Sequence, residues 1–278
     1  MFFYDIIASK ERLFMKHVLI SGAYGGMGKA TAELFAKQGY TVFALDKRID
    51  APTHNIIPIE ADVTDSESIS SAFEKVCTYT DELYAIIHFA GIYRLDSLVE
   101  ISEERFLQIF NINLNGVFRI NKYFLPLLKK GSRIIITSSE LAPLDPLPFT
   151  GIYAITKSAL EKYAYSLRME LQLLGIKVCV IRPGAVKTPL LGDSTSELDK
   201  FTENTKLYSC NANRFKRIVD SVEAKNVTPE KIAKVALKTA ERKRPRQVVC
   251  INRNPLLLLL NLLPCSLQTF IIKLILKP

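Results

Sequence analysis

The stretch from Val18 to Ala30 constrains the fold more than any other part of this chain of 278 residues. A short apolar run leads into a cluster of glycines, and a helical pattern follows directly. This order predicts a strand, a tight turn and a helix. Gly22 would let the turn close, Gly26 would let an anion such as a pyrophosphate approach the backbone, and Gly28 would let the helix pack closely. A tight turn without a ligand is the alternative reading of the glycines alone.

Apolar runs alternate with helical patterns along the rest of the chain. Runs that predict strands cover 41–45, 56–59, 83–89, 133–137, 176–181 and 247–251, and helical patterns cover about 28–37, 65–77, 102–118, 151–174 and 228–242. Apolar strands that alternate with helices indicate a parallel sheet covered on both faces. A chain of this length can bury the core of one such α/β domain.

Charge and cysteine usage narrow the function classes. The formal net charge is +9, and basic residues gather late in the chain, with a cluster at 242–246. A solvated basic helix face explains this cluster more simply than an anionic membrane surface, and no nucleic-acid motif accompanies it. The five cysteines are scattered without a CxxC pair or a neighbouring histidine. This argues against a metal site and for a reducing compartment, the cytoplasm.

Asp46 closes the second predicted strand, 24 residues after Gly22 (46 − 22). An acidic residue near this spacing meets the adenosine ribose hydroxyls in dinucleotide-binding folds, and its charge repels a 2′-phosphate. The position therefore favours NAD over NADP, although Lys47 and Arg48 follow at once and could soften the preference. A plain turn residue at the end of a strand is the alternative.

Ser138 and Ser139 follow the fifth predicted strand, and Tyr153 and Lys157 follow at a spacing that places them on one helix face. A tyrosine titrates near 10, too high for a base at neutral pH, and a nearby ammonium group lowers that pKa. Ser139 can hydrogen-bond a substrate oxygen while the phenol exchanges a proton with it and a nicotinamide exchanges hydride with the adjoining carbon. Each residue alone has an ordinary alternative interpretation: Tyr153 could be an interface aromatic, and Lys157 could be a solvated helix lysine.

Six signals now stand in one order along the chain. They are Ser21-Gly22-Ala23-Tyr24-Gly25-Gly26-Met27-Gly28, Asp62-Val63, Ala90-Gly91, Asn113 within 111–116, Ser139 with Tyr153-Ala154-Ile155-Thr156-Lys157, and Pro183-Gly184-Ala185-Val186-Lys187-Thr188. From about Lys16 to Leu190 the chain thereby resembles the short-chain dehydrogenase/reductase family, and its retinol and hydroxysteroid dehydrogenase-like members. The resemblance implies a single doubly wound Rossmann domain with a seven-stranded parallel sheet and a C-terminal helical elaboration.

The resemblance also implies an NAD(P)-dependent enzyme acting on CH–OH groups and assigns roles to residues. Tyr153 would be the general acid/base, Lys157 would lower its pKa and bind the nicotinamide ribose, and Ser139 would orient the substrate. Asn113 would hold a water of the proton relay through a main-chain distortion. The implied cofactor-binding residues are Ser21, Gly22, Tyr24, Gly26, Met27, Gly28, Asp46, Asp62, Val63, Ala90, Gly91, Tyr153, Lys157, Pro183, Gly184, Val186 and Thr188.

Two departures from the family pattern bear on the site. His88-Phe89 stands where the family usually has two asparagines, which puts cofactor affinity in doubt, and we expect His88 to pack at the strand end. The segment 140–149 is about one residue longer than the commonest form, so Ser138 is a fallback for the role of Ser139. We expect Asn111 and Asn115 to be surface or capping residues.

The remaining segments bear on the substrate and partners. Residues 1–14 form an N-terminal arm that we expect to be dispensable, ahead of the domain at 15–255. Residues 190–226 lack a strong period and would form a mobile lid, or else an ordinary surface helix pair. Apolar candidates for the substrate pocket are Leu190, Leu191, Phe201, Leu207, Tyr208 and Phe215.

The C-terminal segment 256–278 combines a leucine run with an amphipathic helix. It is too interrupted to span a bilayer, which needs about 20 apolar residues. It could pack over the substrate mouth, join a dimer or contact a membrane peripherally. It favours a small lipophilic substrate such as a retinoid, steroid or fatty alcohol. The expected assembly is a homodimer or homotetramer. Two rival functions stay open: an NADPH-dependent carbonyl or acyl-thioester reductase, and a non-catalytic NAD-binding sensor or membrane-associated scaffold.

Overall fold

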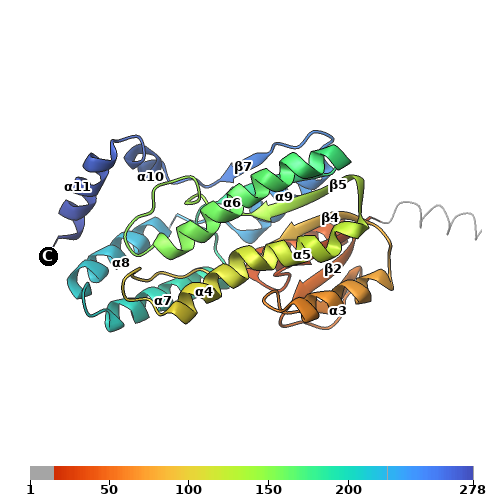
Figure 1. The fold of residues 1–278 in the computed structure, drawn as a ribbon, viewed down its shortest axis with the longest axis horizontal. Helices are drawn as coiled ribbons and strands as arrows, with labels where there is room; N and C mark the ends of the chain where they lie inside the picture. The colour runs from red at the N-terminus through yellow and green to blue at the C-terminus, as the bar shows by residue number, and fades with distance from the viewer. Residues whose placement is uncertain (1–15, 224, 278) are drawn as a thin grey trace, which may run out of the picture.

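Seven parallel strands form the centre of the protein, in a computed structural model that describes residues 16–223 and 225–277 (Figure 1). The side chains of 189–196 and 220–223 and the predicted arm at 1–14 lie outside the described part of the structure. The strands are β1 (His17–Ser21), β2 (Thr41–Asp46), β3 (Ile56–Glu60), β4 (Leu83–His88), β5 (Leu128–Thr137), β6 (Lys177–Pro183) and β7 (Val248–Ile251).

The strand order is β3-β2-β1-β4-β5-β6-β7, and every neighbouring pair is parallel. The chain reverses its direction of winding between β1 and β4, and in such sheets ligands bind outside the carboxyl ends of the strands at that point. The predicted doubly wound fold is confirmed. The strands are apolar on both faces because helices cover both; Val18, Leu19 and Ile20 of β1 are fully buried.

Helices form a layer on each face of the sheet. Helices α3 (Ser66–Cys77), α5 (Gly116–Phe124) and α6 (Gly151–Leu171) cover one face, and α2 (Gly26–Lys37) and α9 (Pro229–Glu241) cover the other (Figure 1). The local sequence starts these helices: the Asp65 carboxylate accepts a hydrogen bond from the Glu67 amide at α3, and Pro229 begins α9. Short 3₁₀ turns at Leu125–Leu127 and Gln172–Leu174 follow α5 and α6.

A π-helical turn joins α4 (Glu103–Phe110) to α5. It spans Asn111–Asn115, and the Gly116 amide donates to the Asn111 carbonyl five residues back. The sequence suggested one continuous helix here, with a main-chain distortion implied only by the family resemblance. A π turn inside a helix often marks a functional site.

The segment at 190–226 folds into two helices, α7 (Pro189–Asn204) and α8 (Ser209–Glu223). The helical alternative is confirmed in its secondary structure, and the role as a mobile lid stays a prediction. Of the six apolar candidates, Phe201 and Phe215 are buried and Tyr208 is partly buried, whereas Leu207 is exposed. The side chains of Leu190 and Leu191 lie outside the described residues.

A third apolar cluster holds these helices together at one end of the molecule. The Phe149 ring contacts the rings of Phe201, Tyr208 and Phe215 at centroid distances of 4.7, 5.3 and 5.5 Å. Leu276 of α11 (Cys265–Leu276) joins the same cluster, after the short helix α10 (Pro255–Leu260). The C-terminal segment is thus helical and docks on α8, as Figure 1 shows.

Candidate active site

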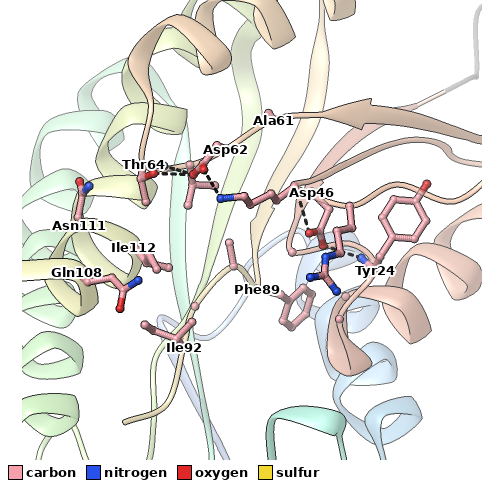
Figure 2. Close-up of a pocket in the computed structure, with 18 of the residues that line it drawn as sticks. Tyr24, Asp46, Ala61, Asp62, Thr64, Phe89, Ile92, Gln108, Asn111 and Ile112 are labelled. Atoms are coloured by element: carbon pink, nitrogen blue, oxygen red, sulfur yellow. Dashed lines mark hydrogen bonds and ion pairs between the residues drawn. The ribbon is translucent and has the colours of Figure 1, made fainter. Parts of the chain in front are cut away.

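A cavity of about 1030 Å³ lies over the carboxyl ends of β1, β2 and β4 (Figure 2). Its floor is the turn from β1 into α2. Gly22 has a φ of +68°, and a Cβ at Gly28 would lie 2.0 Å from the Gly22 carbonyl oxygen, so only glycine fits at both positions. Helix α2 has no side-chain cap and no acidic residue in its first turn, which leaves its N-terminal amides free for an anion.

Asp46 is held at the edge of this cavity by two backbone amides. The Tyr24 amide donates to Asp46 Oδ2 at 3.0 Å, and the Lys47 amide donates to Asp46 Oδ1 at 2.8 Å (Figure 2). Each carboxylate oxygen accepts one of these bonds and keeps acceptor capacity for a further donor. Asp46 is therefore oriented to receive two hydroxyl groups from the cavity.

Lys47 reaches across the cavity edge to Asp62, not back to Asp46. Its Nζ lies 2.8 Å from Asp62 Oδ2, while Thr64 donates to Asp62 Oδ1 through its amide and its hydroxyl (Figure 2). Burial alone would raise the pKa of Asp62, but the bonds from Lys47 and Thr64 lower it to about 2. No local motif predicts this ion pair, which depends on the ends of β2 and β3 lying side by side.

A second cavity, of about 200 Å³, is lined by three of the four predicted catalytic residues. Tyr153 and Lys157 reach it from α6, and Ser139 from the end of β5. Met27, Phe89, Gly91, Ile92 and Thr188 border both cavities, which makes the two cavities one continuous site. Pro183, Gly184 and Val186 also line this second cavity, at the end of β6.

Burial sets the protonation of the catalytic pair. It raises the pKa of Tyr153 to about 12, against the hydrogen bond with the Ser139 side chain, which lowers it. Burial lowers the pKa of Lys157 to about 8. The Lys157 ammonium donates to the Thr137 carbonyl at 3.2 Å and lies 5.6 Å from the centre of the Tyr153 ring. Burial of the phenol, opposed only by the bond to Ser139, therefore keeps the pKa of Tyr153 above its ordinary value in this structure, and the expected lowering by Lys157 stays a prediction.

Ser139, not Ser138, partners Tyr153. The Ser139 hydroxyl hydrogen-bonds the Tyr153 side chain and accepts from the Leu141 amide at 3.2 Å. Ser138 is buried, and its hydroxyl finds no partner among the described residues. The longer segment after Ser139 is tied back to α6, because the Ser158 hydroxyl donates to the Ala142 carbonyl at 2.7 Å.

Asn113 lies fully buried in the π turn and borders neither cavity. Its amide group accepts from the Ile92 amide at 2.8 Å and donates to the Ile92 carbonyl at 3.0 Å and to the Thr156 hydroxyl at 3.1 Å. These bonds fix the segment that follows β4 to α6 at Thr156, the residue before Lys157. This position fits a structural role beside the catalytic pair.

His88 packs at the end of β4, as expected from the sequence. Its Nε2 lies 2.9 Å from Asn121 Oδ1, and Asn121 donates in turn to the Tyr163 hydroxyl at 3.1 Å. Complete burial lowers the pKa of His88 to about 4, so the ring is neutral at physiological pH. Ser21, buried beneath the glycine turn, borders neither cavity, unlike the other predicted cofactor-binding residues.

Several residues of the site escaped the sequence reasoning. The Tyr93 ring meets the Tyr153 ring edge-on at a centroid distance of 4.6 Å. Glu140, buried beside Ser139, accepts from the Asn254 amide at 2.6 Å and ties the C-terminal segment to the catalytic strand. Leu257 of α10 lines the catalytic cavity. Only the three-dimensional fold brings these residues to the site, since they belong to no local motif.

The residues present fit a dinucleotide. The free helix N-terminus suits a pyrophosphate, the oriented Asp46 suits a ribose, and the cavity is at the upper end of the usual range for small ligands, about 300–1,000 Å³. Among the described residues no group of His, Cys, Asp or Glu side chains could hold a metal ion.

Comparisons with known proteins agree with this geometry. The family described as short chain dehydrogenase matches residues 16–199, and the chain belongs to this family of NAD(P)-dependent oxidoreductases. A 3-ketodihydrosphingosine reductase of Bacteroides thetaiotaomicron is 28% identical over 229 residues, 82% of this chain and 84% of that protein.

Two further similar proteins cover different shares of the chain. Estradiol 17-beta-dehydrogenase 2 of Mus musculus is 34% identical over 191 residues, 64% of this chain but only 50% of that protein. A solved short chain dehydrogenase family protein from Francisella tularensis has a TM-score of 0.72 at 22% identity and covers 85% of this chain and 97% of that chain. The resemblance stated from the sequence is thereby confirmed.

Proposed function

We propose that this oxidoreductase interconverts an alcohol and its carbonyl on a lipophilic substrate, with NAD as the preferred cofactor. The observation that carries the proposal is the hydrogen-bonded Ser139–Tyr153 pair, which lines the second cavity together with Lys157. This cavity is continuous with the larger one over the glycine turn. A substrate oxygen placed between the two hydroxyls would be held for proton transfer. A bound nicotinamide would accept or supply the hydride at the adjoining carbon.

In the oxidative direction, Tyr153 as phenolate takes the hydroxyl proton while the C–H electron pair leaves as hydride. In the reductive direction the Tyr153 hydroxyl returns a proton to the carbonyl oxygen, so protons and electrons balance both ways. Ser139 hydrogen-bonds the substrate oxygen and orients it. Lys157, charged below a pKa of about 8, favours the phenolate electrostatically once substrate and cofactor exclude water.

In this proposal Asn113 is a positioning residue, which holds neighbouring groups in place. Its three hydrogen bonds hold Ile92 and Thr156 in place, and the π turn frees backbone groups that can hold a water of the proton relay. The relay would carry the proton between Lys157 and solvent.

The lining of the catalytic cavity supports a lipophilic substrate. Apart from the catalytic edge and Glu140, the wall is largely apolar and comes from the 141–147 segment, α8 and α10, including Leu147, Phe215, Val219 and Leu257. Such a wall gains free energy by burying hydrocarbon, about 25 cal/mol per Å². A retinoid, a steroid and a fatty alcohol all fit this description.

Asp46 supports NAD over NADP. Its two oxygens face the cavity with their orientation fixed by backbone amides, and a ribose 2′-phosphate there would meet an uncompensated carboxylate. Lys47 does not neutralise Asp46, because its ammonium pairs with Asp62.

The test is a fluorescence titration of the purified protein with NADH and NADPH, alongside Asp46→Ala and Tyr153→Phe. We expect wild type to bind NADH at least tenfold more tightly, Asp46→Ala to lose this preference, and Tyr153→Phe to bind NADH normally but to lose turnover of lipophilic alcohols. Equal or tighter NADPH binding by wild type would refute the cofactor preference. Full turnover by Tyr153→Phe would refute the mechanism.

A reductase working with NADPH is the second candidate, and Arg48 favours it. This basic side chain lines the cavity beside Asp46, where a 2′-phosphate would lie. The same titration with Arg48→Ala separates the two: NADPH affinity falls if Arg48 binds the phosphate and stays unchanged if Asp46 governs the choice.

Assembly and location are also part of the proposal. Phe118, Leu125, Tyr165 and Met169 are exposed around α5 and α6, which supports a homodimer or homotetramer through these helices. All five cysteines are unpaired, which supports the reducing cytoplasm. In the described part of the chain, no helix combines the length and the apolarity needed to cross a bilayer.

A further inference from the structure

The C-terminal helices carry an unusual apolar surface, here called the leucine surface. It consists of Leu256 and Leu259 on α10, Leu262 in the turn, and Leu267, Phe270 and Leu274 on α11. Five of these six side chains are at least 60% exposed, and Leu267 is 41% exposed. Single exposed leucines are ordinary, but so many on two consecutive helices indicate a surface that binds a partner.

The leucine surface is anchored, not loose. The Asp145 amide donates to the Asn261 side chain at 2.7 Å, and Asn211 of α8 donates to the Leu276 carbonyl at 2.6 Å. Leu276 itself is buried against α8, so α11 presents its opposite face outward. The exposure of Phe270 and Leu274 is therefore a fixed feature of the fold.

The charged residues of the C-terminal segment itself are all basic. From Asn252 to Lys277 the chain contains Arg253, Lys273 and Lys277 and no Asp or Glu, and the acidic neighbour on the inner side is Asp145, whose carboxylate accepts from the Gln268 side chain at 3.3 Å. Lys273 follows Phe270 by about one helical turn, and Lys277 directly follows the end of α11, so two lysines accompany the apolar stripe of this helix. Apolar side chains bordered by lysines suit an anionic lipid surface, where the lysines reach the headgroups.

A second copy of the chain fits this surface less well. A symmetric pairing of leucine surfaces would bring Lys273 and Lys277 of both copies together with no acidic residue on the same segment to neutralise them. A bilayer that contains anionic lipid supplies the opposite charge and the apolar phase together.

The leucine surface is also continuous with the catalytic cavity. Leu257 lines that cavity, whereas its chain neighbour Leu256 points to the outside. The Asn254 amide bonds to buried Glu140, directly after Ser139, so the start of α10 is fixed to the catalytic strand. One short helix therefore closes the substrate cavity on one side and carries the leucine surface on the other.

From these contacts we infer that the leucine surface docks on an anionic membrane and that the lipophilic substrate passes from the bilayer into the cavity beside α10. This inference rests on the proposed function for the nature of the substrate. The helices lie on the membrane without crossing it, with the lysines at the headgroups.

The test is co-sedimentation of the purified full chain with vesicles of phosphatidylcholine alone or mixed with phosphatidylglycerol. We expect binding to the mixed vesicles, weaker binding to phosphatidylcholine alone, and about tenfold or greater loss of binding in the double variant L256S/L262S. The matched control is L173S/L174S, two exposed leucines after α6, which should bind as wild type does.

Two results would overturn the inference: no binding of wild type to mixed vesicles, or equal binding by L256S/L262S. If that variant binds vesicles equally and the mass of the assembly falls, the leucine surface joins copies of the chain instead. Turnover of a water-soluble alcohol without vesicles tests the proposed function separately. Normal turnover without vesicle binding refutes the docking alone, and vesicle binding by a protein that turns over no alcohol refutes the proposed function alone.

Discussion

Lys157→Met should stabilise the cofactor-free protein while abolishing its activity. Burial lowers the pKa of Lys157 from its ordinary 10.5 to about 8. At pH 7 the folded protein must keep an ammonium group in an apolar setting, and each pKa unit corresponds to about 1.4 kcal/mol. The charge therefore costs about 3 kcal/mol, from which a lost hydrogen bond to Thr137, worth about 1 kcal/mol, is subtracted. The net gain is about 2 kcal/mol.

The free energy of unfolding of the two proteins should depend on pH in different ways. Between about pH 8 and 10.5 the unfolded chain still holds the Lys157 proton that the folded chain has released, so wild type gains stability as pH rises. Lys157→Met lacks this gain, and the difference between the two proteins should shrink steadily above pH 8. Tyr153 acts in the opposite sense only above about pH 10, because its folded pKa is about 12.

Urea unfolding of the two proteins at pH 7, 8, 9 and 10 measures the difference. Lys162→Met on the same helix, at an exposed position, is the matched control and should change the free energy of unfolding by no more than about 0.5 kcal/mol. At pH 7 the Lys157 variant should also melt about 4–8 °C higher. A variant that is less stable than wild type at pH 7, or a difference independent of pH, would refute the reasoning.

Three further predictions rest on other contacts. Burial lowers the pKa of His88 to about 4, so wild type should lose about 3 kcal/mol as pH falls from 6.5 to 4, and His88→Asn should lose less in the same urea series. Gly184→Ala places a Cβ 2.0 Å from the Asn252 carbonyl oxygen and should cost at least about 2 kcal/mol in urea, against about 1 kcal/mol for Gly39→Ala in open space. Glu197→Gln breaks the buried ion pairs of α7 with two arginines at 3.0 Å, and limited proteolysis should cleave α7 faster while β1 stays protected.

The sheet was predictable because its rules are local. Parallel strands buried on both faces need continuous apolar runs, and Val18–Ile20 and Leu83–Phe89 are such runs. The carboxyl ends of parallel strands lie at one edge, so Asp46, Ser139 and Gly184 had to gather there once the strands were assigned. The ends of elements were less certain, since β5 begins at Leu128 and not at Arg133.

Features that depend on tertiary distance could not be predicted. The pairing of Lys47 with Asp62 requires β2 and β3 to end side by side. From the sequence, Lys47 was expected to affect the choice of cofactor and Asp62 to bind it. The sequence left 190–226 open between a mobile lid and a helix pair, because its apolar residues pack around Phe149 and the C-terminal helix, which gives no clean one-sided period. The pKa of Tyr153 could not be predicted either, because the extent of its burial is known only from the packed structure.

The polar side chains buried at the site make the fold less stable, and this helps to distinguish an enzyme from a non-catalytic sensor. The hydroxyls of Thr137 and Ser138 have no partner among the described residues, and Lys157 lies buried beside them. Each of these groups makes the fold less stable than an apolar side chain of similar size would. In a protein that only bound a dinucleotide, Lys157→Met would increase the stability of the fold. The glycine turn and Asp46 would keep their contacts with the cofactor. A buried lysine that destabilises the fold beside Tyr153 is what proton transfer needs, and contact with the nicotinamide ribose alone gives no reason for the neighbouring Ser139–Tyr153 pair.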